Sequence, residues 1–184
     1  MDAGLPFASG GGAVTGWETS ERVLESGAFE SRQRVLAAKP SVEASEAGAR
    51  TLGIAYWQAV DRFTRGGIRA NWTGDGGKLK LLGGPTLLTF GPAELSFDGG
   101  LVSCRYTIQG GLLALGASGS VTLAQQPEGD QQELSVTVEG YLPRLAARAG
   151  APPWTGMLYA NGQSPLHIAV SRRYFELLLR GRDS

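Results

Sequence analysis

The feature that most constrains the fold is a change in hydrophobic period at Gly67. From there to Val138, apolar residues alternate with polar ones in short runs, a pattern typical of strands with one buried face. Seven strands are predicted, at residues 68–72, 78–81, 86–90, 94–98, 102–108, 121–123 and 134–138. No connection between them can hold a crossover helix, so neighbouring strands must pair antiparallel. Many of the 28 glycines fall between these runs and mark turns, and Asp98-Gly99 is the strongest hairpin signal.

Two amphipathic helices flank the predicted strands. The first extends from Ser41 to about Thr64, because its apolar residues recur at helical spacing and Gly66 can supply a left-handed stop. The second begins at Ser164-Pro165 and ends at Arg180. Its apolar stripe is broad and suggests burial against a curved sheet or a second chain; the stripe consists of Leu166, Val170, Tyr174 and Leu177, widened by Ile168, Phe175, Leu178 and Leu179.

The N-terminal part has no comparable pattern. Residues 1–18 are small, rich in glycine and unpatterned, and we expect a flexible tail. Residues 19–40 are charged and are interpreted as a helical extension, with Ser20 as N-cap and Pro40 at its end. The remaining residues, 41–184, then form a single α+β domain.

Charge and composition exclude several classes of function. Seventeen basic residues balance seventeen acidic ones, so no nucleic-acid partner is expected. One cysteine and one histidine do not make a disulfide or a standard zinc site, and we expect neither metal nor cofactor. No apolar run approaches the length of a membrane span and no secretory signal is present, which predicts a cytoplasmic protein without stable membrane insertion. Arginine-rich basic composition suggests a bacterial source.

The order of helix, antiparallel strands and long C-terminal helix resembles the START/Bet v 1-like helix-grip superfamily. The resemblance covers about residues 45–181 and rests on element order and on the character of Pro165–Arg180. It implies a curved sheet wrapped around the C-terminal helix, with an apolar ligand held between them; some members are cyclases or lipid carriers. The sequence departs from that pattern before the first helix, where only residues 13–17 could form a strand. A closed calycin-like β-barrel with flanking helices is the alternative fold.

Four side chains are candidates to contact a ligand: Trp72, Tyr106, His167 and Tyr174. Each combines an apolar body with a polar group that could orient a bound molecule. His167 is the best candidate catalytic residue, because the N-terminal dipole of the predicted last helix would keep its imidazole neutral. Cys104 falls on the apolar face of its strand and is interpreted as a small buried hydrophobic residue.

The main hypothesis is therefore binding of a small apolar molecule in a cavity between the curved sheet and the C-terminal helix. Such a cavity should measure on the order of several hundred cubic ångströms. One alternative is an enzyme of cyclase or isomerase type on the same scaffold, which needs a titratable group inside the cavity. Another is a structural protein that forms homo-oligomers through residues 19–39 and the broad apolar face of the last helix.

Overall fold

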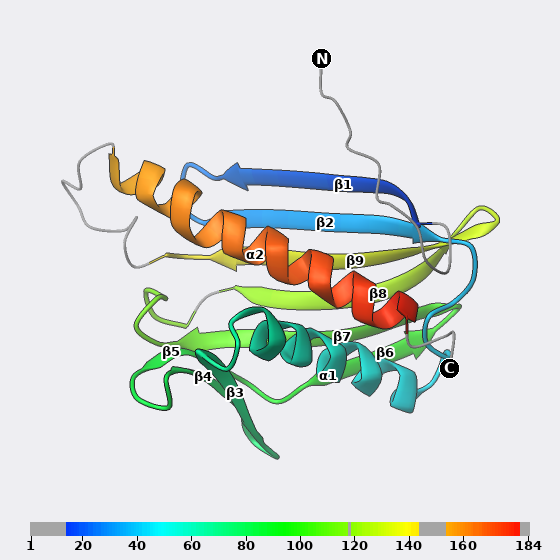
Figure 1. The fold of residues 1–184 in the computed structure, drawn as a ribbon, viewed down its shortest axis with the longest axis horizontal. Coiled ribbons are helices and arrows are strands. Elements are labelled where there is room, and N and C mark those ends of the chain that lie inside the picture. Colours follow the sequence, from blue (N-terminus) through cyan, green and yellow to red (C-terminus); the bar gives the residue numbers. More distant parts are fainter. Residues whose placement is uncertain (1–13, 118, 144–153, 181–184) are drawn as a thin grey trace.

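An open antiparallel sheet carries both described helices on one of its faces (Figure 1). The computed structural model describes the backbone of residues 14–117, 119–143 and 154–180, and the side chains of residues 16–117, 119–143 and 167–180. The elements follow in the order β1 (Val14–Val23), β2 (Phe29–Ala37), α1 (Glu46–Phe63), β3 (Ile68–Thr73), β4 (Gly76–Leu81), β5 (Thr86–Phe90), β6 (Glu94–Asp98), β7 (Leu101–Gly110), β8 (Ser120–Glu128), β9 (Gln131–Tyr141) and α2 (Trp154–Arg180).

The sheet does not close on itself. Its strands are ordered β1-β2-β9-β8-β7-β5-β4-β3, with β6 also paired to β7, and every pairing is antiparallel. Within the described residues β1 pairs only with β2, β3 only with β4 and β6 only with β7, so the sheet has open edges. The predicted α+β class is confirmed, whereas the alternative of a closed calycin-like barrel is wrong.

Both helices pack against the same face of the sheet, as in the predicted helix-grip architecture. Figure 1 shows α2 lying across β9 and β8, and α1 beside it in front of β7 and β6. Tyr174 of α2 is fully buried, and its ring centroid lies 5.7 Å from that of Tyr56 on α1. The strand that the resemblance required before the first helix is β2, which pairs with β9.

The N-terminal helical extension predicted for residues 19–40 is wrong, because this segment forms most of the hairpin β1–β2. Alternate residues of β2 are buried, but two of them, Ser31 and Gln33, are polar and conceal the period of two. Hydrogen bonds satisfy both: Gln33 Nε2 donates to Ser31 Oγ at 2.5 Å, and Ser171 Oγ donates to Gln33 Oε1 at 3.3 Å. The predicted flexible tail lies outside the described residues up to residue 13, and residues 14–18 belong to β1.

The seven strands predicted from the alternating pattern are confirmed as β3 to β9, but both helices differ at their N-terminal ends. α1 begins at Glu46 rather than at Ser41, because the Ser45 hydroxyl caps the helix and accepts a hydrogen bond from the Gly48 N–H at 3.1 Å. α2 begins at Trp154, ahead of the predicted start at Ser164.

Gly53 allows α1 to approach β7 closely. A Cβ atom at this position would lie 2.2 Å from Tyr106 Oη and 2.9 Å from Cys104 Sγ, and real Cβ atoms do not approach neighbours so closely. Both neighbours are buried side chains of β7. A glycine inside a helix costs about 1 kcal/mol relative to alanine. Here that cost is offset by the tight contact between helix and sheet.

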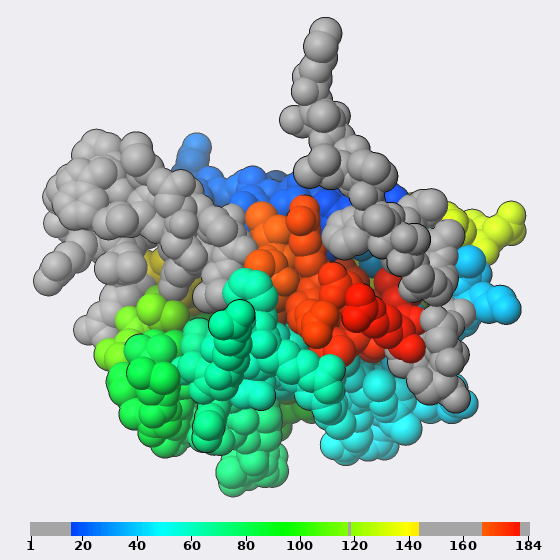
Figure 2. Space-filling view, viewed as in Figure 1, coloured from blue at the N-terminus to red at the C-terminus, as the bar shows by residue number. Residues whose placement is uncertain are grey.

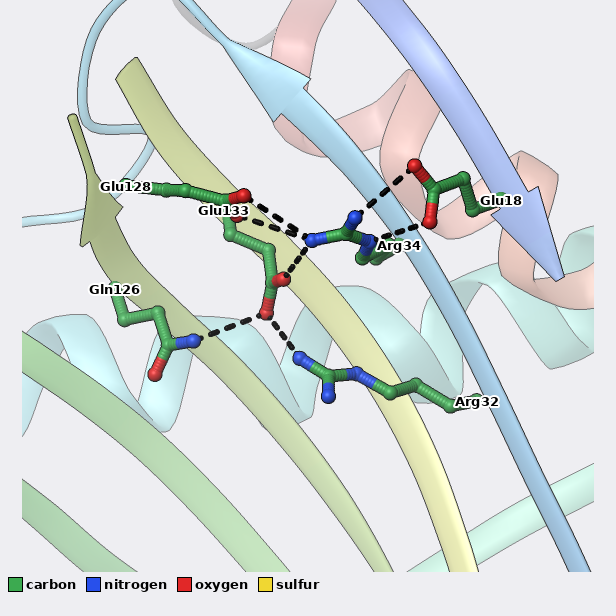
Figure 3. A network of polar contacts seen from close by, with 6 residues as sticks. All are labelled: Glu18, Arg32, Arg34, Gln126, Glu128 and Glu133. Carbon is green, nitrogen blue, oxygen red and sulfur yellow. Dashed lines mark hydrogen bonds and ion pairs between the residues drawn. The ribbon is translucent and has the colours of Figure 1, made fainter. Parts of the chain in front are cut away.

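A network of charged side chains joins β1, β2, β8 and β9 on the face of the sheet opposite the helices (Figure 3). Arg34 is at its centre and donates two hydrogen bonds to Glu18, at 2.8 and 3.0 Å, and one to Glu133 at 3.0 Å. Glu133 is almost fully buried and also accepts from Arg32 at 2.7 Å. Burial pushes the pKa of Glu133 upward, but Arg34 and Arg32 outweigh it and hold this pKa below its usual value.

We expect Gly53→Ala to destabilise the protein by about 1–2 kcal/mol. Alanine has the higher helix propensity, but the steric cost of placing its methyl group against the Tyr106 hydroxyl is larger. Thr51→Ala is the matched control, because Thr51 is exposed on the same helix. Urea denaturation should show little change for the control. A Gly53→Ala protein as stable as the parent would contradict the close contact.

Glu133→Gln should cost about 2 kcal/mol at pH 7, because two arginines lose a buried anionic partner. Glu18→Gln, which removes an exposed partner of the same Arg34, should cost less than about 1 kcal/mol. Since the pKa of Glu133 is lowered on folding, its contribution is complete above the ordinary pKa of 4.5 and is lost as the pH falls through the lowered value. Denaturation at pH 7 and at pH 3 should show the Glu133→Gln deficit shrinking in acid.

Candidate functional site

A cavity of about 160 Å³ lies between α1, α2 and the sheet. Its lining is dominated by apolar and aromatic side chains and comes from both helices, from seven strands and from the connections after α1 and β7. The lining residues are Phe29, Tyr56, Trp57, Val60, Thr64, Ile68, Leu79, Leu87, Leu88, Phe90, Ile108, Leu113, Val121, Val138, Tyr141, His167 and Val170. Its volume is below the several hundred cubic ångströms expected for the predicted ligand site.

Two polar groups of the lining already form hydrogen bonds within the protein. The Tyr141 hydroxyl donates to the Leu113 carbonyl at 2.8 Å. Thr64 Oγ1 donates to the Val60 carbonyl at 2.9 Å and accepts from the Ile68 N–H at 3.0 Å. These groups therefore position the wall of the cavity rather than offering a free hydrogen bond to a ligand.

Two lining side chains carry a buried polar atom without a hydrogen-bond partner among the described residues, Trp57 through Nε1 and His167 through Nε2. An indole N–H can only donate, whereas the imidazole of His167 can donate or accept. Its Nδ1 lies 3.4 Å from Tyr56 Oη, and this weak hydrogen bond can have either direction, depending on the imidazole tautomer. Its Nε2 is buried and has no hydrogen-bond partner among the described residues. A buried polar atom without a partner is costly, so Nε2 is a point at which a bound molecule can gain a hydrogen bond.

Burial keeps both members of this pair neutral. It lowers the pKa of His167 from 6.5 to about 4, and it raises the pKa of the Tyr56 phenol above its usual value. The predicted neutral imidazole therefore has a different cause from the one expected. His167 lies well inside α2, which begins at Trp154, so the dipole of a first helical turn does not act on it.

The other three predicted site residues do not line the cavity. Trp72 and Tyr106 pack on one another with ring centroids 4.7 Å apart, and both contact Trp57, at 4.9 and 5.3 Å. They support the cavity wall from behind, since Trp57 is a lining residue. Tyr174 packs on Tyr56, another lining residue, from the side of α2.

Two lining residues, Tyr56 and Trp57, were missed as site candidates. Tyr56 belongs to the predicted apolar stripe of the first helix, where it was interpreted as core. The available signal was its hydroxyl, because a buried tyrosine needs a polar partner and the chain has a single histidine to supply one. Cys104 is buried as predicted, and burial raises the pKa of its thiol, which disfavours the reactive thiolate.

Two features are absent from the described residues. No group of three or more histidine, cysteine, aspartate or glutamate side chains is placed there to hold a metal ion. In the same part of the chain, no helix is both long and apolar enough to cross a membrane.

Comparison with solved structures found loose similarities. The solution structure of CalU16 from Micromonospora echinospora is 16% identical over 95% of this chain and 78% of that chain, with a TM-score of 0.39. A crystal structure of CalU16 is 16% identical over 90% and 94%, with a TM-score of 0.35. The crystal structure of Ara h 8.0201 is 15% identical over 88% and 99%, with a TM-score of 0.37.

No protein-family model matches the chain, and no curated protein matches it. The helix-grip architecture of this chain rests on its own element order and strand pairing.

A histidine that is buried and neutral should make the folded state sensitive to acid. Because the folded pKa of about 4 is below the ordinary 6.5, the unfolded chain binds more protons between these values, and stability should fall as the pH drops from 6.5 to 4. The loss due to His167 should reach about 2–3 kcal/mol. Denaturation at several pH values should show that His167→Gln removes this part of the pH dependence.

The same shift can be measured directly, since the chain has one histidine and gives one imidazole signal. An NMR titration should place its midpoint near pH 4. A midpoint near 6.5 would contradict the burial of His167.

Proposed function

We propose that this protein binds a small apolar molecule that carries one hydrogen-bonding group, in the cavity between α1, α2 and the sheet. The observation that carries the proposal is His167 Nε2, a buried polar atom without a hydrogen-bond partner among the described residues, in a cavity whose lining is mostly apolar. An apolar ligand gains free energy by leaving water, and one polar contact fixes its orientation.

The volume limits the size of the ligand. An engineered protein cavity of about 150 Å³ holds a benzene molecule, so about 160 Å³ suits one aromatic ring or a branched chain of similar size. Val60 on α1 and Val170 on α2 form part of the wall. A larger ligand would have to move a helix away from the sheet.

The pKa of His167 favours binding over catalysis. A general base works best when its pKa is near the working pH, and an imidazole with a pKa of about 4 is a weak base at neutral pH. It remains a good hydrogen-bonding group. The cyclase or isomerase alternative therefore requires the ligand to raise this pKa on binding, and turnover that survives His167→Gln would remove His167 from any catalytic role.

The homo-oligomer alternative loses both of its sequence arguments. Residues 19–37 form the β1–β2 hairpin from Thr19 onward, and the apolar stripe of α2 is covered within one chain, because Val170, Tyr174 and Leu178 are buried there. Light scattering tests the oligomeric state. Location in the cytoplasm and the absence of a nucleic-acid partner stay predictions.

The proposal is tested with p-cresol and toluene, two one-ring probes that differ by a hydroxyl group. We expect p-cresol to bind about fivefold more tightly, the value of one net hydrogen bond, and His167→Phe to abolish this preference. Isothermal titration calorimetry or native mass spectrometry can measure both probes.

Filling the cavity gives the matched control. Val60→Phe should abolish binding of both probes, whereas Ile54→Phe, at an exposed position of the same helix, should leave it unchanged. Absence of binding to the parent protein, or equal binding to the Val60→Phe variant, would overturn the proposal.

A further inference from the structure

Exposed apolar side chains gather at one end of the molecule, where the connections α1–β3, β4–β5 and β7–β8 meet (Figure 1). We call this set the leucine rim: Phe63, Leu81, Leu82, Leu112 and Leu115. Backbone hydrogen bonds hold the connections together, from the Leu82 N–H to the Gly67 carbonyl at 2.7 Å and from the Leu112 N–H to the Thr86 carbonyl at 3.2 Å. Leu82 is 80% exposed at the tip of its turn.

Basic residues are frequent in the part of the sequence that carries the first three residues of the leucine rim. Residues 61–82 contain five of them against two acidic residues, in a chain with no net charge. The basic residues are Arg62, Arg65, Arg69, Lys78 and Lys80. None of the five forms an ion pair with a described residue. Figure 2 shows the region of α1 and β3 to β5, in teal and green, as a continuous part of the surface.

Two features of this region work against folding. Arg69 and Lys80 are directly opposite each other on β3 and β4, where like charges repel. Arg65 and Leu82 are the non-glycine residues with positive φ among those described, at 51° and 49°, and glycine or asparagine would adopt this conformation at lower cost. The cation and the leucine at these two positions are therefore exposed at a cost in stability.

We propose that the leucine rim and the five basic residues dock on the surface of an anionic lipid bilayer. Anionic headgroups attract lysine and arginine side chains, and exposed leucines enter the boundary between headgroups and acyl chains. A purely electrostatic partner such as RNA would not account for Leu82.

Docking in this way would bring the cavity next to the bilayer. Thr64, Ile68, Leu79 and Leu113 line the cavity, and each is adjacent in sequence to a residue of the docking surface. The docking itself depends on the surface and not on the proposed ligand.

Co-sedimentation with vesicles tests this inference. The parent protein should bind vesicles that contain about a third of phosphatidylglycerol, bind phosphatidylcholine vesicles weakly, and be released by salt. Reversing two charges in Lys78→Glu/Lys80→Glu should weaken binding at least about 25-fold, since each basic residue contributes about fivefold. Lys39→Glu, at the other end of the sheet, is the charge control.

Leu82→Asn tests the apolar contribution without disturbing the turn, because asparagine tolerates the left-handed conformation. It should weaken vesicle binding about tenfold, whereas Leu101→Asn, at the partly exposed first residue of β7, should not. Binding of p-cresol to Leu82→Asn should stay unchanged, which separates this inference from the proposed function. No binding to either vesicle, or equal binding by all variants, would overturn the inference and leave an acidic protein as the partner to test.

Discussion

The contact between Gly53 and the side chains of Tyr106 and Cys104 sets the distance between α1 and the sheet. With no Cβ at this point, the helix lies directly on β7. The next turn of α1 carries Tyr56 and Trp57. Their large rings take the place of the close contact there, and both line the cavity. The cavity therefore results from a local change in side-chain size along one helix. The rest of the site depends on this contact, because it fixes where Tyr56 meets His167 of α2.

Seven strands and the cores of two helices could be predicted from the sequence, since their buried positions are apolar and follow one period. β2 could not, because Ser31 and Gln33 occupy inward positions and hydrogen bonds satisfy them there. Those bonds need Ser171, 138 residues away from Gln33 in the sequence. A pattern of neighbouring residues in the sequence cannot reveal such a distant partner. The polar residues Ser31 and Gln33 were therefore interpreted as part of an exposed helix surface.

The candidate site was predictable only in part, for a related reason. His167 could be identified because it is the single imidazole, yet its neutral state comes from burial, which only the packed fold reveals. Trp72 and Tyr106 were placed on the correct face of their strands. They do not reach the cavity because they pack on Trp57, so the aromatic cluster forms its wall. Contacts across three elements decide which aromatic residues line the cavity and which support its wall.

Zero net charge conceals an uneven distribution of charge. Around Arg34 the carboxylates of Glu18 and Glu133 are paired with arginines, and these pairs lie on the strands near the β1 edge. Charges that are paired at short range produce little field at a distance. At the opposite edge, β3 and β4 carry Arg69 and Lys80 without an ion-pair partner among the described residues. The zero net charge counted from composition therefore includes a part of the sheet where charges are paired, around Arg34, and a part where Arg69 and Lys80 have no ion-pair partner among the described residues. The second part is better suited to attract an anionic partner.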